Sequence, residues 1–202
     1  MSIKQRIREQ ASRLFFKNGI RTVTMSDVSE ALGMSKRTLY EHFSNKEELL
    51  VSCIRDEHLR GLQRREEVEK EASSTLDIMY RHFREAVVVL RELNPVFLVE
   101  LKKFHPEIWK NEIEPLEKER DEYISHLIEQ GIEQGLFYPG INSAIAAKLL
   151  HAQVEIMSDS EIFPLGQYSM ADVFQQIFTV FTRGMATTRG LQVFDQLFNN
   201  DK

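Results

Sequence analysis

This chain of 202 residues has little cysteine, glycine and proline, and it has no long apolar run. Cys53 is its single cysteine, so an intramolecular disulfide is excluded, and we expect a packed thiol in a cytoplasmic protein. With only 9 glycines and 5 prolines, the composition is that of a globular protein rather than a fibrous or disordered one. The longest apolar run, residues 86–90, is far shorter than the ~20 residues of a membrane span, so we expect no membrane association.

Motifs of catalysis are also missing from the sequence. It contains no glycine-rich phosphate loop, no Gly-x-Ser-x-Gly elbow and no Cys/His set with zinc spacing, so we expect no enzymatic activity, cofactor or metal. His151 and Glu155 stand four residues apart, as do Glu122 and His126, but a carboxylate bundle needs repeated ligands on facing helices. A metal-binding or enzymatic helical bundle, or a helical binding module without DNA binding, is therefore a weaker hypothesis than the function that the following features indicate.

Charge is unevenly distributed along the chain. Residues 1–46 carry nine basic and four acidic residues, a net charge of +5, which leaves −10 for the rest of a chain whose total is −5. Binding to nucleic acid relies on neutralising phosphates with Lys and Arg. The asymmetry therefore favours a small cationic module that meets DNA, attached to a larger acidic body.

Helical periodicity and helix-start signals run through almost the whole chain and predict an all-α protein. Helices are expected at residues 2–19, 24–33, 35–43, 45–71, 75–93, 95–103, 106–135 and 143–158, with a last one from residue 169. N-terminal caps are expected at Ser2 with Gln5, Thr24 with Asp27, Ser35, Ser44 with Glu47, Asn142 or Ser143, and Ser169 with Asp172. Pro115 should kink its helix, and residues 86–90 should be buried on all sides.

Residues 24–43 have the form of two helices joined by a tight turn at Gly33, which is the helix-turn-helix arrangement. Apolar side chains should fix the angle between the two helices, and we expect this role for Val28, Ala31, Met34 and Leu39. Such packing leaves the N-terminal side chains of the second helix exposed for the major groove of DNA.

The residues around this turn form a recognisable combination: Gly19, Thr22-Val23-Thr24-Met25, Asp27-Val28, Leu32-Gly33, Leu39-Tyr40-Glu41-His42-Phe43 and Lys46-Glu47-Glu48-Leu49. Over about residues 3–52 the chain thereby resembles the TetR family of bacterial transcription regulators. Ser29 departs from the alanine usual there. Elsewhere only length, helicity and a Gly-Leu-Phe-x-Pro loop resemble the family.

The resemblance implies an N-terminal three-helix DNA-binding domain, residues 1–48, followed by a helical-bundle domain for ligand binding and dimerisation, residues 49–202. We expect Ser35, Lys36, Arg37 and Thr38, at the start of the second helix of the motif, to contact base edges and nearby phosphates. Thr24 and Lys46 stand at helix N-termini suited to phosphate. By resemblance, Tyr40 and His42 are further DNA contacts.

A helix-turn-helix reads few base pairs, so we expect a homodimer on a double-stranded DNA operator, joined through the last two major helices. The expected dimer-interface residues are Ile145, Leu149, Ile156, Val173, Ile177, Val180, Phe181 and Gly184. In this family a small-molecule effector usually binds the variable domain, and the expected pocket residues are Phe83, Phe97, Phe104, Trp109, Tyr123 and His151. The sequence thus predicts a repressor that an unidentified effector releases from its operator.

Overall fold

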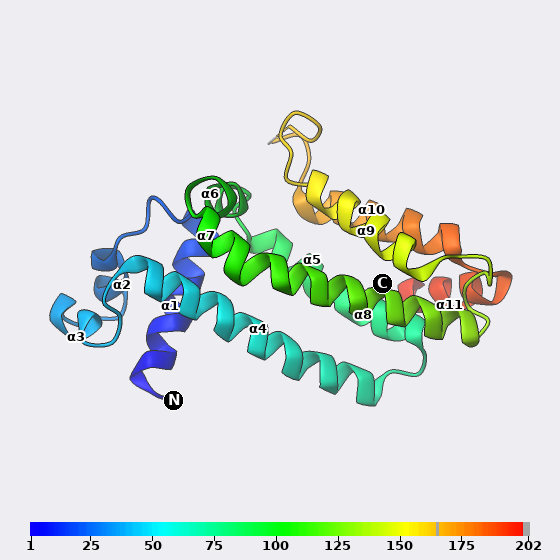
Figure 1. Ribbon diagram of the computed structural model, residues 1–202, viewed down its shortest axis with the longest axis horizontal. Helices are drawn as coiled ribbons and strands as arrows, with labels where there is room; N and C mark the ends of the chain where they lie inside the picture. Colours follow the sequence, from blue (N-terminus) through cyan, green and yellow to red (C-terminus); the bar gives the residue numbers. More distant parts are fainter. Residues whose placement is uncertain (165, 200–202) are drawn as a thin grey trace. The chain divides into compact units, whose positions relative to one another are not determined.

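The computed structural model describes residues 1–164 and 166–199, which form helices joined by loops (Figure 1). The all-α prediction is confirmed; the one β-type pairing among the described residues is an isolated bridge between Phe137 and Ala186. In chain order the helices are α1 (Ile3–Asn18), α2 (Met25–Ala31), α3 (Lys36–Tyr40), α4 (Lys46–Glu71), α5 (Thr75–Glu92), α6 (Val96–Phe104), α7 (Pro106–Ile108), the π-helical turn η1 (Trp109–Ile113), α8 (Glu114–Glu133), α9 (Ser143–Ile156), α10 (Met170–Met185) and α11 (Thr188–Asn199).

The chain forms two compact units. We call Met1–Gln63 together with Glu92–Leu116 the head unit, and Arg64–Arg91 together with Glu117–Lys202 the body unit. The head unit, as a packed unit, therefore extends beyond residue 48. It also includes residues 92–116, from the middle of the chain. The expected functional boundary between residues 48 and 49 stays a prediction.

Most helix starts are where the sequence predicted them. The side chains of Ser2, Thr24, Ser35, Asn142 and Ser169 each accept a hydrogen bond from the backbone amide three residues on. The start of α4 differs from the prediction: Asn45, not Ser44, caps the helix, with its Oδ1 accepting from the Glu48 amide at 2.8 Å. The Glu48 carboxylate in turn accepts from the amide and hydroxyl of Ser44 at 2.7 and 2.6 Å. The helix therefore begins one residue later than it would if Ser44 and Glu47 formed the predicted cap.

The core of the head unit joins α1, the helix-turn-helix and the start of α4. Its fully buried side chains include Ile7 and Phe15 of α1, Val28 of α2, Leu39 of α3 and Leu49 of α4. Ala31 was expected here but is exposed. The buried face of the short helix α2 is formed by Met25, Val28 and Ser29, and Ala31 lies to the side of that face.

The helix expected over residues 106–135 is interrupted before its proline. Within η1 the hydrogen-bond spacing widens, so that the Glu114 amide donates to the Trp109 carbonyl five residues back. Pro115 has no amide hydrogen to donate, and its ring would crowd the carbonyl four residues earlier in a regular α-helix. The irregularity at this proline is therefore a π-helical turn directly before it, and a kink of the helix axis stays a prediction.

The body unit is centred on stacked aromatic rings. Phe83 and Phe178 stack with ring centroids 4.3 Å apart, as do Phe194 and Phe198. Phe194 and Phe198 belong to α11, which the sequence analysis missed, although Leu191, Phe194 and Phe198 repeat at helical spacing.

The prediction that residues 86–90 are buried on all sides is wrong. Val87 is buried, but Val88 is 59% exposed and Val89 is 48% exposed. Helix α5 contacts its neighbours through one stripe only, which contains Tyr80, Phe83 and Val87. Among the described residues no helix is both long and apolar enough to cross a membrane.

Candidate nucleic-acid interface

The turn between α2 and α3 fixes the second helix of the motif. Gly33 has φ of +63°, a left-handed conformation that suits glycine, and the Met34 amide donates to the Ser29 carbonyl at 3.0 Å. Val28 and Leu39 are both completely buried on either side of this turn. Helix α3 is therefore held by its apolar side, and its other side is left to solvent.

The predicted base-contacting residues lie together on this open side. Ser35 caps α3 by accepting from the Thr38 amide at 3.1 Å, and the two hydroxyl oxygens are 2.9 Å apart. Lys36, Arg37 and Tyr40 are exposed, whereas Thr38 is half-buried. His42 follows the helix and is also half-buried.

Arg37 has a side chain that is almost fully open to solvent. It is 90% exposed and forms an ion pair with Glu41, 59% exposed, with 3.2 Å between Nε and Oε1. Exposed pairs of this type add little stability, because solvent screens both charges. The guanidinium can therefore leave Glu41 at small cost and turn towards a ligand.

Thr24 begins α2 with a reciprocal cap. Its hydroxyl accepts from the Asp27 amide at 3.2 Å, and the Asp27 carboxylate accepts from the amide and hydroxyl of Thr24 at 2.7 and 2.8 Å. The backbone and side-chain hydrogen bonds from Thr24 lower the pKa of Asp27, with smaller contributions from Lys36 and Lys46. A phosphate at Thr24 would compete with this carboxylate for the same donors.

Lys46, the first residue of α4, is half-buried with its ammonium turned inward. Its Nζ donates to the Val23 carbonyl at 2.8 Å, and burial lowers its pKa despite the nearby carboxylates of Glu100 and Asp27. An ammonium has three donors, so two are not used by this bond. Lys46 therefore supports the residue next to Thr24, and a phosphate contact by its other donors is compatible with this position.

The sequence analysis missed Glu100 of α6. This carboxyl side chain is buried, with 8% exposure, and one of its oxygens accepts from the amides of Ile20 and Arg21. The signal in the sequence was a single acid within the apolar run Val96-Phe97-Leu98-Val99 and Leu101. Such an acid is expected to have a partner if it is buried.

The six expected pocket residues are divided between the two units, three in each. In the head unit Phe97 is buried, Trp109 packs against the core, and Phe104 is 45% exposed with the Arg21 guanidinium 4.6 Å from its ring centroid. In the body unit Phe83 belongs to the aromatic cluster. The pocket stays a prediction.

The other two expected pocket residues of the body unit are in polar contacts. The Tyr123 hydroxyl donates to Glu69 at 2.7 Å, and Nδ1 of His151 is 2.9 Å from both carboxylate oxygens of Asp121. An open groove of about 420 Å³ between side chains of α4 and α5 is lined by none of the six. Within the described part of the chain, no cluster of three or more His, Cys, Asp or Glu could hold a metal ion.

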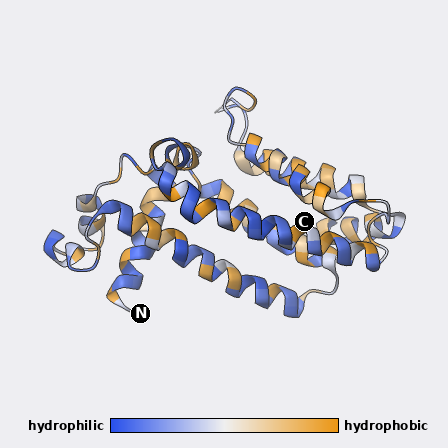
Figure 2. Ribbon diagram, viewed as in Figure 1, coloured by the Kyte–Doolittle hydropathy of each residue, from blue (hydrophilic) through white to orange (hydrophobic). Residues whose placement is uncertain are grey.

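The expected dimer surface is largely open in the single chain. Ile145, Leu149 and Ile156 of α9 are 58%, 56% and 42% exposed, and Val180 of α10 is 68% exposed. Figure 2 shows the hydrophobic character of these two helices. Gly184 is exposed, and Ile177 and Phe181 are half-buried. Val173 differs from expectation: it is only 7% exposed, so its own chain already covers it.

Comparisons with known proteins agree with this geometry. The family described as bacterial regulatory proteins, tetR family, matches residues 7–53, which span the helix-turn-helix. The HTH-type transcriptional regulator YfiR of Bacillus subtilis is 33% identical over 153 residues, covering 70% of this chain and 71% of that protein.

Two further similarities extend over nearly the whole chain. The HTH-type transcriptional repressor KstR2 of Mycolicibacterium smegmatis is 22% identical over 200 residues, 94% of this chain and 93% of that protein. A TetR-family transcriptional regulator from Agrobacterium tumefaciens has the same fold, with a TM-score of 0.72 and 17% identity over 91% of this chain and 97% of that chain. These matches are regulators and not enzymes, in line with the lack of catalytic motifs.

Proposed function

Since this chain belongs to the TetR family of bacterial regulatory proteins and is a DNA-binding transcription regulator, we propose that it acts as a homodimeric repressor in the cytoplasm. Each head unit places α3 in the major groove of an operator half-site, and a small molecule bound by the C-terminal helices releases the protein. The observation that carries this proposal is the exposed side of α3, which presents Lys36, Arg37 and Tyr40 on a fixed scaffold.

The contacts follow from the position of each side chain. Ser35, Lys36, Arg37 and Thr38 meet base edges and adjoining phosphates, with Arg37 suited to a bidentate contact with guanine. Tyr40 and His42 reach the DNA backbone, and Thr24 and Lys46 hold phosphate at the N-termini of α2 and α4. The net charge of +5 on residues 1–46 supports binding to a polyanion.

Dimerisation is proposed through α9 and α10. Two heads separated by about 34 to 36 Å can enter successive major grooves on one side of the duplex. The exposed apolar residues of α9 and α10 support this assembly, because an isolated chain gains nothing from leaving them in water. The operator is then a pseudo-palindrome, since its two halves meet identical heads.

The test is a selection from fragmented genomic DNA with the purified full chain, followed by binding measurements on the selected duplex. We expect one recurring pseudo-palindromic sequence, tight binding to it, and an affinity that falls steeply with salt. Small molecules are then screened for release of the selected duplex. Equal binding to selected and random duplexes would refute sequence-specific regulation and favour a module for protein association.

A further inference from the structure

We propose that Glu100 is a positioning residue for DNA binding: it holds the turn between α1 and α2 in the conformation that presents the helix-turn-helix to the operator. The inference rests on the proposed DNA-binding function and adds a residue outside the motif. All of the contacts that carry it lie within the head unit.

A single carboxylate oxygen organises this turn. Oε2 of Glu100 accepts from the Ile20 amide at 2.6 Å and from the Arg21 amide at 2.9 Å, across 80 and 79 residues of sequence. Ile20 is completely buried, so its amide has no access to bulk water. Hydrogen bonds to an ionised acceptor are about twice as strong as neutral ones, so the turn is firmly held.

The residue before these amides is shaped for the same contact. Gly19 ends α1 with φ of +83°, and a β-carbon built on it would stand 2.9 Å from Oε2 of Glu100. Any other residue would therefore be strained in its backbone and would also crowd the carboxylate. Glycine at this position allows α6 to approach the end of α1 closely.

The segment that carries Glu100 also binds the end of α1 itself. The amide of Asn94 donates to the Phe16 carbonyl at 2.8 Å, and its Nδ2 donates to the Lys17 carbonyl at 3.3 Å. Phe16 and Phe97 meet edge-to-face with centroids 4.9 Å apart. Residues 92–116 thus satisfy carbonyls at the end of α1 through Asn94 and the amides that follow through Glu100.

The far end of the turn is held by a charge of opposite sign. Lys46 of α4 donates to the Val23 carbonyl, which lies two residues after Arg21 and one before the capping residue Thr24. The turn is therefore fixed by a carboxylate at its start and by an ammonium at its end. Because Thr24 begins α2 directly afterwards, the direction of α2, and of α3 packed against it, depends on this turn.

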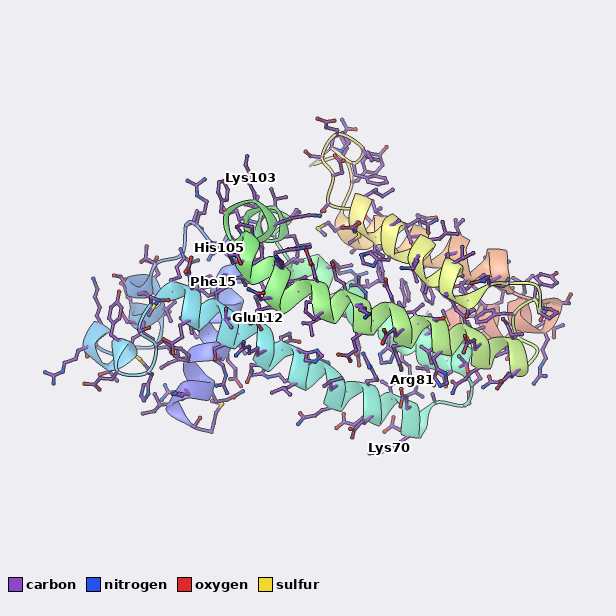
Figure 3. The ribbon with its side chains drawn as sticks, in the orientation of Figure 1. Phe15, Lys70, Arg81, Lys103, His105 and Glu112 are labelled. Atoms are coloured by element: carbon purple, nitrogen blue, oxygen red, sulfur yellow. The ribbon has the colours of Figure 1, made fainter. Side chains whose placement is uncertain are left out.

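Segment 92–116 is anchored to α4 as well as to α1. Arg55 of α4 makes two hydrogen bonds to Glu112 of η1, at 2.8 and 2.6 Å (Glu112 is labelled in Figure 3). Glu100 therefore lies on a segment that is itself held by contacts to α1 and α4. A displacement of its carboxylate requires the surrounding contacts to move with it.

The sign of the effect on DNA affinity distinguishes this role from simple electrostatics. A negative charge close to a DNA-binding surface repels phosphate, so its removal should strengthen binding if only charge matters. A positioning role predicts the opposite, since loss of the acceptor frees the turn and leaves two amides without their partner. Two variants of equal charge separate the acceptor from the charge.

The experiment compares Glu100→Gln with Glu100→Met on the operator duplex selected with the wild-type chain. Both remove one negative charge, but glutamine keeps an oxygen that can accept from both amides. We expect Glu100→Gln to bind within roughly threefold of wild type and Glu100→Met to bind about tenfold or more weakly. Random duplex, held through phosphates, should bind both variants equally. Glu107→Gln, at an exposed carboxylate of α7, is the charge control and should match or slightly exceed wild type.

Amide hydrogen exchange gives a second readout. In the folded Glu100→Met chain the amides of Ile20 and Arg21 should exchange faster than in Glu100→Gln, with core amides of α1 unchanged. If the methionine variant does not fold, Glu100→Ala replaces it, because alanine leaves room for water beside the amides. Equal operator affinity for the glutamine and acceptor-free variants would overturn the inference. A wild-type chain that selects no operator would overturn the proposed function instead.

Discussion

Among single residues, Arg37 is the one whose surroundings best suit recognition of a base. Its guanidinium is open to solvent and loosely held by Glu41. Arg37→Ala should weaken binding to the selected operator by about 1 to 3 kcal/mol if the side chain contacts guanine bidentately, and it should relax the preference at that base pair. Binding isotherms on the operator and on single-base variants measure this effect.

Lys36→Ala is the matched comparison, since it removes the same charge from the neighbouring exposed position. A phosphate contact there should weaken binding to operator and random DNA alike and reduce the salt dependence. If Arg37→Ala behaves in that uniform way too, Arg37 is a phosphate contact and the sequence preference has to come from other residues of α3.

A second residue-level prediction concerns His82 of α5. Its Nε2 lies 3.2 Å from the Tyr123 hydroxyl, and burial lowers the pKa of His82 below its usual 6.5. As pH falls below 6.5, the unfolded chain takes up a proton at this position before the folded chain does, so the free energy of unfolding decreases. His82→Asn should therefore flatten the loss of stability between about pH 7 and pH 5. Urea unfolding of both chains across this range measures it, and parallel curves would contradict the prediction.

At the scale of helices and turns, the sequence predicted most of the features that depend on neighbouring residues alone. The caps at Thr24 and Ser35 and the left-handed turn at Gly33 depend on neighbouring residues, so the motif and its exposed side chains could be placed in advance. The hydrogen bonds that Glu100 accepts from the Ile20 and Arg21 amides could not be predicted, because they join residues some 80 positions apart. The exposure of Val88 and Val89 escaped prediction for a similar reason: an apolar run does not say how many of its sides have neighbours.

Helix α11 offers a test of close packing between elements. A β-carbon on Gly190 would stand 2.0 Å from the Leu136 carbonyl oxygen, so α11 approaches the loop after α8 more closely than any side chain permits. Gly190→Ala should lower the free energy of unfolding by about 1 to 3 kcal/mol, since the backbone must shift to admit the methyl group. Gly140→Ala is the control, because no atom lies within 4 Å of its built β-carbon. Denaturant unfolding measures the free energy of unfolding of both variants, and equal stability would argue against this packing.

Across the whole molecule, the excess of positive charge and the exposed apolar residues of α9 and α10 lie in different parts of the chain. The positive charge is concentrated in residues 1–46, and residues 47–202 carry a net −10. The largest exposed apolar side chains of α9 and α10 belong to this acidic part. The acidic residues 47–202 are repelled by DNA, so this charge distribution favours complexes in which residues 1–46 meet the duplex. A homodimer of this kind needs a contact between two copies, and the exposed apolar residues of α9 and α10 support the interface proposed there.

The dimer is tested by placing a charge on that surface. Val180, 68% exposed in the single chain, costs little to replace with glutamate if it faces water, but a charge buried against a partner without a counter-ion is strongly unfavourable. We therefore expect Val180→Glu to be folded and monomeric by analytical ultracentrifugation. Its operator affinity should fall to that of a single head or below, because one protein no longer binds both half-sites. Leu149→Glu on α9 should behave in the same way.

Val88→Glu provides the matched control for this experiment, since Val88 is a valine of similar exposure, 59%, on α5 of the same unit. It should stay dimeric and bind the operator as wild type does, because the proposed interface does not include α5. If Val88→Glu were monomeric and Val180→Glu were dimeric, the dimer interface would have to be assigned to α5. The operator half-sites would then have to be explained by a different pairing of the two bodies.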